Sequence, residues 1–154
     1  MVNKNTMNMT IRTTNDQAIR LFFVAILSFT GCFSSPKPWE ITHPASGTVE
    51  LKGKPIENAE LTLFPVDTNV PESVRPRAKS TTGGKFVLGT YSQSDGAPVG
   101  KYKVTLVRND VSVSKDTIVA KPNDLPPKYS SVSTTDIVLE IAEGNNELPA
   151  IVLK

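Results

Sequence analysis

The chain has 154 residues, of which 38% are hydrophobic and 21% are charged, and its formal net charge is +2. This composition allows one domain of ordinary size with some chain to spare, and it excludes both a disordered tail and a multi-span membrane protein. Three basic residues and one acidic residue precede Cys32, which leaves 14 basic and 14 acidic residues after it. The later part of the chain is therefore formally neutral. Because it has no basic stripe interleaved with aromatic residues, we expect no nucleic-acid partner.

The N-terminal segment has the pattern of an export signal. A predominantly apolar run of 11 residues, 21–31, directly follows Arg20. A run of this length is typical of a signal-peptide h-region, whereas a helix that crosses the hydrocarbon core needs ~20 apolar residues. We therefore expect residues 1–31 to be a signal peptide and the protein to be exported.

Cys32 is the one cysteine of the chain, and it directly follows Thr30 and Gly31. Small residues before a lone cysteine resemble the lipobox of bacterial lipoproteins, although Phe29 stands where that family usually carries Leu or another aliphatic residue. The resemblance implies that Cys32 becomes the acylated, palmitate-type N-terminus and anchors the protein in a membrane, on its periplasmic side or at the cell surface. The alternatives are an unpaired thiol in an uncleaved anchor or in a soluble secreted protein, since a lone cysteine has no internal disulfide partner.

Residues 32–44 are rich in Ser and Pro, which predicts a tether without packed structure. Trp39 lies in this segment, where ordinary packing and the lipid interface are its two alternatives. His43 is the single histidine of the chain and has no cysteine or acid positioned beside it in sequence. We expect it to be an exposed linker side chain.

After the tether, alternation of apolar and polar side chains predicts a series of short strands. They lie at 46–52, 59–65, 77–82, 85–88, 101–107, 136–141 and 150–153. The central strand is 101–107, which follows a turn at Asp95 and Gly96 and directs Tyr102, Val104 and Leu106 inward.

The segments between these strands predict turns and loops. Gly83 and Gly84 join 77–82 and 85–88 in a predicted hairpin, and residues 66–76 form a loop. Residues 108–129 are predicted to be a long loop, with a brief pairing of 112–114 and 117–119 as the alternative. About seven short strands, and no helical period after residue 40, predict an all-β sandwich.

Several motifs resemble the carboxypeptidase regulatory-like, or transthyretin-like, domains of small exported lipoproteins of planctomycete-type bacteria. The matching stretches are 47–49, 53–59, 83–86 and 100–104, and the most specific are 95–102 and 125–129. The likeness covers about residues 45–154. It implies a Greek-key sandwich of transthyretin-like or immunoglobulin-like type that has no enzymatic activity. Where such families read Asp-x-Asp-Gly-x-Phe, this chain has Thr-Thr-Gly-Gly-Lys-Phe at 81–86.

The residues give little support for catalysis, metals or cofactors, and we expect none of the three. Asp110, Asp116 and Asp124 lack the spacing of a calcium loop. Tyr91 and Tyr129 are the candidate ligand-contacting aromatic residues, because aromatic rings stack on sugar faces, and a core or anchoring role is the alternative.

These observations predict a non-enzymatic, membrane-anchored lipoprotein. Its sandwich, at residues 45–154, would serve an envelope structural, adhesion or protein-interaction role with a protein or polysaccharide partner. The alternative is a carbohydrate-binding module at the cell surface.

Overall fold

The computed structural model describes residues 35–109, 111–114 and 117–154, with the backbone alone for 111–114 and 117–120. The described part consists of strands and short 3₁₀ turns. The longer strands are β1 (Ala45–Leu51), β3 (Glu60–Pro65), β6 (Gly100–Val107), β7 (Val111–Ser114), β8 (Thr117–Ala120) and β9 (Val138–Ile141). The shorter ones are β2 (Lys54–Pro55), β4 (Arg77–Lys79), β5 (Lys85–Val87), β10 (Asn146–Glu147) and β11 (Ile151–Leu153). The 3₁₀ turns are η2 (Pro38–Glu40), η3 (Thr82–Gly84) and η4 (Pro127–Tyr129).

The predicted alternation is present along the main strands. In β6, Tyr102, Val104 and Leu106 are fully buried, and in β3 the same is true of Leu61 and Leu63, which are at most 1% exposed. Alternate side chains of a strand point to opposite faces, so each of these strands presents one apolar face to the interior. The structure therefore confirms the inward set that the sequence predicts for β6, and β3 buries alternate side chains in the same way.

Two sheets carry these apolar faces. In the first sheet, β1 is central and pairs in parallel with β10 and β11 and antiparallel with β2 and β5. The second sheet has the order β4-β3-β6-β9, and all of its pairings are antiparallel. A separate two-stranded sheet is formed by β7 and β8. The brief pairing that the sequence left as an alternative for this segment is thus present.

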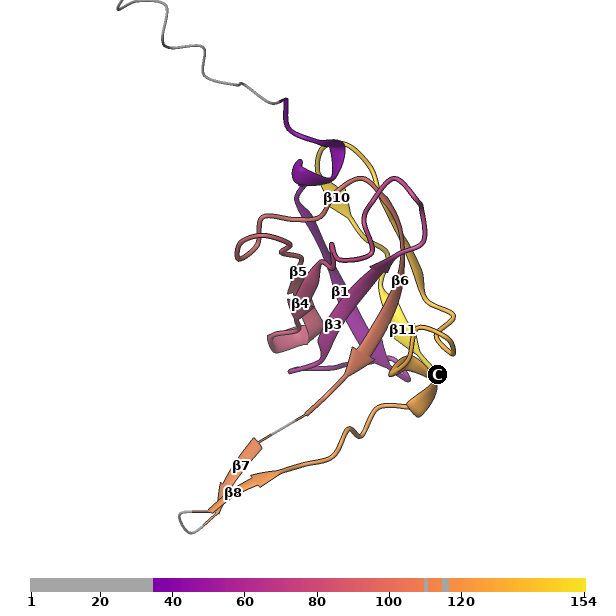
Figure 1. The fold of residues 1–154 in the computed structure, drawn as a ribbon. Helices are drawn as coiled ribbons and strands as arrows, with labels where there is room; N and C mark the ends of the chain where they lie inside the picture. Colours follow the sequence, from indigo (N-terminus) through magenta and orange to yellow (C-terminus); the bar gives the residue numbers. More distant parts are fainter. Residues whose placement is uncertain (1–34, 110, 115–116) are drawn as a thin grey trace, which may run out of the picture. The chain divides into compact units, whose positions relative to one another are not determined.

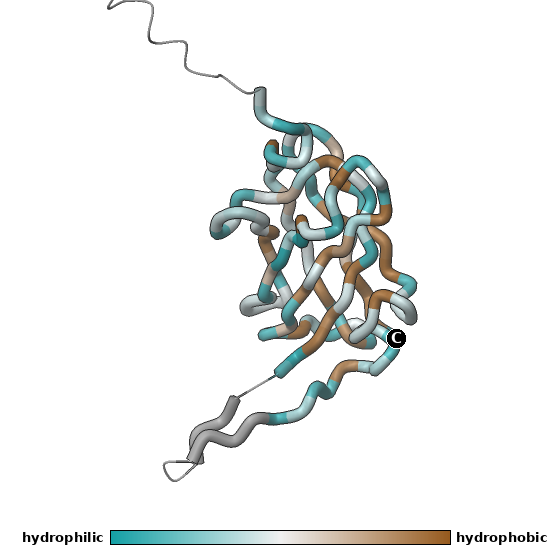
Figure 2. The backbone as a smooth tube through the Cα atoms, viewed as in Figure 1, coloured by the Kyte–Doolittle hydropathy of each residue, from teal (hydrophilic) through white to brown (hydrophobic). Residues whose placement is uncertain are grey.

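One hydrophobic core lies between the two larger sheets. It joins Val49 and Phe86 of the first sheet with Leu63, Val104 and other residues of the second in a single cluster. In Figure 1 the strands β3 and β6 cross in front of β1 and β11, and in Figure 2 hydrophobic positions recur along the same strands. Two sheets that bury their apolar faces against each other form a β-sandwich, so the predicted all-β sandwich is confirmed. The Greek-key path remains a prediction.

The strand count and one strand pairing differ from the sequence prediction. The described residues form eleven strands rather than about seven, among them the two-residue β2 and β10 and the separate β7–β8 pair. The predicted hairpin of 77–82 with 85–88 forms only in part. Backbone hydrogen bonds join the two segments at Arg77 with Gly89 and at Thr81 with Lys85, but the ladder of β4 is with β3 and that of β5 is with β1. These two strands are neighbours at one edge of the sandwich, where they belong to different sheets (Figure 1).

The compact unit begins earlier than the predicted domain. It extends from Pro36 to Lys154, so that residues 36–44, which the sequence assigned to the tether, lie within it. The predicted signal peptide 1–31 and Cys32 lie outside the described residues. None of the helices in the described part of the chain is long and apolar enough to cross a membrane.

Candidate functional site

A largely apolar cavity of about 700 Å³ lies at the end of the sandwich where the described chain begins. Four segments meet there: η2 with the residues after it, the loop after β3, the residue before β6 and the turn after β9. The lining side chains are those of Pro38, Trp39, Ile41, His43, Thr68, Asn69, Val70, Val99 and Glu143. We call this opening the tether-end cavity. Its walls combine apolar side chains from residues distant in sequence, which is typical of a binding cleft.

Trp39 is positioned by short-range bonds around η2. Pro38 begins this turn with a preset φ, and Glu40 accepts the Lys37 N–H on its carboxylate at 3.0 Å. The Tyr91 hydroxyl donates to the Trp39 carbonyl, and the Lys37 ammonium lies 5.4 Å from the centre of the indole ring. Trp39 is partly buried and packs against the core. The packing alternative for this residue is therefore present, but the ring also contributes to an open cavity.

His43 forms one wall of the tether-end cavity. Its backbone exchanges hydrogen bonds with Ala97, with N–O distances of 2.8 and 3.0 Å. Its Nδ1 accepts the Gly144 N–H at 3.0 Å, and the side chain is half-buried. The predicted exposed linker role of His43 is thus wrong, because the residue ties the first described segment to the loop before β6 and to the turn after β9.

Tyr91 lies beside this cavity on a loop held by Asp95. The Asp95 carboxylate accepts the backbone N–H groups of Thr90, Tyr91 and Ser92 at 2.6, 3.0 and 3.0 Å. This carboxylate fixes the backbone while the Tyr91 ring stays 54% exposed. Partial burial and the negative charges of Glu40 and Asp95 raise the pKa of Tyr91, so its hydroxyl remains a donor. The Tyr91 ring is thus exposed, and its role as a ligand contact stays a prediction.

Tyr129 occupies a different environment. It is 2% exposed, and its hydroxyl accepts the Lys154 N–H at 3.1 Å. The Lys128 ammonium lies 4.6 Å from its ring centre. The ring is not accessible for stacking on a sugar, so Tyr129 has the anchoring role that the sequence gave as the alternative. Of the other candidates, Asp124 pairs with Arg108, and Asp110 and Asp116 lie outside the described residues.

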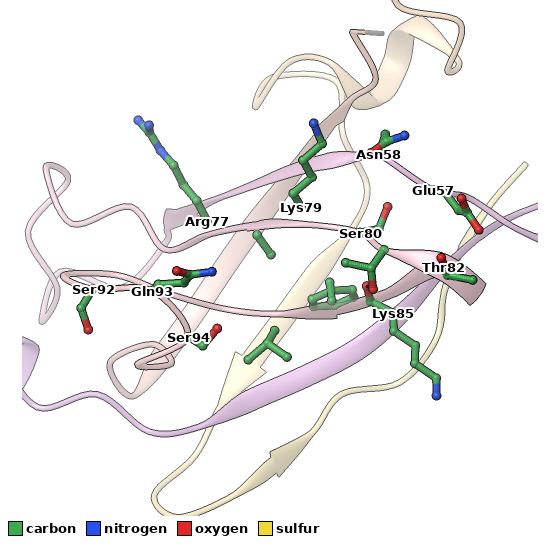
Figure 3. A pocket seen from close by; sticks show the side chains of 15 residues that line it. Glu57, Asn58, Arg77, Lys79, Ser80, Thr82, Lys85, Ser92, Gln93 and Ser94 are labelled. Atoms are coloured by element: carbon green, nitrogen blue, oxygen red, sulfur yellow. Dashed lines mark hydrogen bonds between the residues drawn. The ribbon is translucent and has the colours of Figure 1, made fainter.

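A second, more polar hollow of about 690 Å³ lies between β4 and β5. Arg77 and Gly89 exchange backbone bonds of 2.8 and 2.9 Å at one end, and the Thr81 N–H donates to the Lys85 carbonyl at 2.8 Å at the other. In Figure 3, Arg77 and Lys79 project to one side of the strands and Lys85 projects to the other. The basic side chains of this hollow therefore do not converge on one point.

The most buried polar side chain of this hollow is engaged in the fold. Ser80 is 1% exposed, and its hydroxyl accepts the Ala59 N–H at 2.9 Å and donates to the Ile56 carbonyl at 2.7 Å. Both of its hydrogen-bonding roles are occupied by backbone groups near the start of β3. Among the described residues, no three His, Cys, Asp or Glu side chains are grouped so that they could hold a metal ion.

The tether-end cavity was not identified from the sequence. Trp39 and Ile41 carried a signal, because large apolar side chains are unusual in a solvated Ser- and Pro-rich linker. Among their partners, Val70 lies in the loop after β3 and Val99 directly precedes β6. Strand periodicity does not show that these segments meet at one end of the sandwich.

No family model and no curated protein matches the sequence. Among solved structures, the fold is similar to part of a 9R-lipoxygenase from Cyanothece PCC8801, with 15% sequence identity and a TM-score of 0.41. The likeness covers 89% of this chain and 20% of the lipoxygenase chain, so this chain spans about one fifth of that protein's length. At this level of similarity it carries no argument about activity.

Proposed function

We propose that this protein is an exported lipoprotein whose β-sandwich, of the transthyretin-like kind, is attached to a membrane through acylated Cys32. The position of Cys32 is the observation that carries this proposal. It directly follows an 11-residue, predominantly apolar run that ends in two small residues, and it lies four residues before Pro36, where the compact unit begins. A lipidation site between a leader and a folded unit would attach the sandwich to the membrane surface.

The proposed role is structural or adhesive and non-enzymatic. The interior between the sheets is filled by apolar side chains, and Ser80, Thr105 and Thr135 are the buried polar side chains among the described residues. Their hydroxyl groups bond to backbone groups of the fold. The chain therefore offers its surfaces and end loops for contact with an envelope protein or polysaccharide.

The anchor is tested with Cys32→Ala in the full-length chain expressed in a bacterial host. We expect the unaltered protein to enter the detergent phase on phase partitioning and to carry labelled palmitate, and we expect the variant to lose both properties. Ser34→Ala is the matched control and should behave as the unaltered protein does. A Cys32→Ala variant that still enters the detergent phase would defeat the lipid anchor.

One observation favours carbohydrate binding as the second candidate function. The exposed Tyr91 ring borders a hollow of about 570 Å³ that is also lined by Arg75 and Arg77. An exposed aromatic ring beside hydrogen-bond donors suits a sugar, whose faces are apolar and whose edges carry hydroxyls. Glycan-array binding that is lost in Tyr91→Ala but kept in Tyr91→Phe would support this function. Equal binding by the unaltered protein and Tyr91→Ala would exclude Tyr91 as the stacking residue.

A further inference from the structure

Exposed apolar side chains are concentrated at the end of the sandwich that carries the tether-end cavity. Seven large hydrophobic side chains of the described chain are exposed, and four of them lie around this end. Ile41 and Val99 line the cavity, Tyr91 bonds to the carbonyl of Trp39, and Val66 lies two residues before Thr68 of the cavity wall. The other three are Val87, Val138 and Val152, which lie on three different strands. The cluster is thus a feature of one end and not of the whole surface.

The structure also shortens the tether that the sequence predicted. A tether through residue 44 allows up to about 45 Å of extended chain between Cys32 and the domain, whereas a compact unit that begins at Pro36 allows at most about 14 Å. The headgroup region of a bilayer is itself about 5–8 Å deep on each side. An acylated Cys32 lies within this region, so the end of the sandwich that begins at Pro36 cannot move far from the membrane surface.

We propose that the tether-end face, formed by Trp39, Ile41, Tyr91 and Val99, sits in the interface of the bilayer that holds the acyl chains of Cys32. This inference depends on the proposed lipid anchor. Trp and Tyr favour the headgroup level of a membrane because their rings are apolar and their N–H and O–H groups are polar. With the anchor in place, the face is held near the bilayer at high effective concentration. A modest affinity of the face for the bilayer surface is then enough to keep the two in contact.

The charges around this face indicate which kind of lipid surface it suits. Lys37 is the basic residue next to Trp39, whereas Glu40 belongs to the same turn and Glu143 lines the cavity. An anionic membrane attracts clusters of basic residues. Arg75 and Arg77 border Tyr91 on its other side, but the described residues that line the cavity itself include no Lys or Arg. The face is therefore suited to a zwitterionic surface, through its apolar side chains.

Trp39 is the single tryptophan of the chain, so its fluorescence reports on this face alone. The experiment uses the full-length lipidated protein in phosphatidylcholine vesicles, with and without bromine on the acyl chains. Because bromine quenches indole at short range, we expect brominated lipid to lower Trp39 emission about twofold and vesicles to protect Trp39 from iodide. Raising the salt from about 0.1 M to about 1 M should leave both effects unchanged, although the screening length falls from about 10 Å to about 3 Å.

A pair of double variants separates this face from the rest of the surface. Ile41→Ser with Val99→Ser removes side chains that are 46% and 42% exposed, and Val87→Ser with Val152→Ser removes side chains that are 49% and 48% exposed. We expect the first pair to lose quenching by brominated lipid while the protein stays on the vesicles, and the second pair to keep it. Circular dichroism checks that both variants are folded.

The possible failures are distinguishable. A protein that floats with the vesicles but shows no lipid quenching and full iodide access would overturn this inference and leave the anchor intact. Shielding from iodide that rises with protein density, without lipid quenching, would assign the face to a second copy of the chain and also overturn it. A protein that does not float at all lacks the anchor, which would overturn the proposed function together with this inference.

Discussion

At the residue scale, Asp95 fixes the backbone of the loop beside the tether-end cavity through hydrogen bonds. Its carboxylate accepts three backbone N–H groups from Thr90, Tyr91 and Ser92. Partial burial raises the pKa of this carboxyl. The backbone donors together lower the pKa by more than burial raises it, so the net pKa lies below its ordinary value. The sequence identified Asp95 only as a turn residue before Gly96, because the three donors become neighbours only when the loop closes.

This arrangement predicts a pH-dependent effect of Asp95→Asn. At pH 7 the variant loses charge-assisted bonds, and we expect the free energy of unfolding to fall by about 1–2 kcal/mol. The folded pKa is depressed, so the contribution is complete above the unfolded pKa of about 3.9 and is lost as pH falls through the folded value. Urea titrations of both proteins should therefore show a constant difference above about pH 5 that shrinks at lower pH. A difference that did not shrink would contradict the role of the charge.

At the scale of elements, the turn η3 directs the chain from one sheet to the other. Gly83 and Gly84 both have positive φ, of 75° and 70°. A Cβ on Gly84 would lie 2.4 Å from the Val49 carbonyl oxygen, whereas a Cβ on Gly83 would meet nothing within 4 Å. The Thr81 hydroxyl donates to the Lys85 carbonyl at 3.1 Å and braces the turn where the resembled families carry acids.

The two glycines form a matched pair for a stability test. Gly83→Ala should cost about 1–2 kcal/mol, the penalty for a left-handed non-glycine residue. Gly84→Ala should cost distinctly more, because the turn must also move away from β1. The Val49 carbonyl accepts the Ile56 N–H at 3.0 Å, so exchange of the Ile56 amide should accelerate in Gly84→Ala and not in Gly83→Ala. Equal losses of unfolding free energy in the two variants would contradict the steric argument.

The same turn shows how far sequence reasoning can reach. Alternation correctly predicted short strands at β3, β5 and β6 and the inward face of β6, because burial of every second side chain is a local property of a strand. It did not give the partner of β4, since a glycine turn can return a strand to its neighbour or direct it to another sheet. For this reason the predicted hairpin is present only at its two ends, and no pattern within residues 77–88 shows that β4 and β5 form their ladders in different sheets.

At the scale of the whole molecule, the beginning of the domain was the main structural feature that the sequence did not reveal. Ser and Pro around Trp39 indicated a tether, yet η2 packs its tryptophan against the core and the backbone of His43 pairs with Ala97. Both contacts join residues distant in sequence, so composition alone favoured an unstructured segment. Because this boundary sets the length of the remaining tether, the proposed lipid anchor at Cys32 would hold the sandwich close to a membrane.

The boundary can be tested by unfolding the purified protein. Leu106 is fully buried near the end of β6, whereas Trp39 lies at the end where β6 begins. Leu106→Ala should lower the free energy of unfolding by about 2–5 kcal/mol. Since residues 36–154 form one compact unit, Trp39 fluorescence and far-UV circular dichroism should give the same urea midpoint in each protein and shift together.

Val138→Ala, at a side chain that is 54% exposed, is the control and should shift neither signal appreciably. If residues 36–44 were an unstructured tether instead, Trp39 emission would stay constant while the circular dichroism signal of the sheets disappeared.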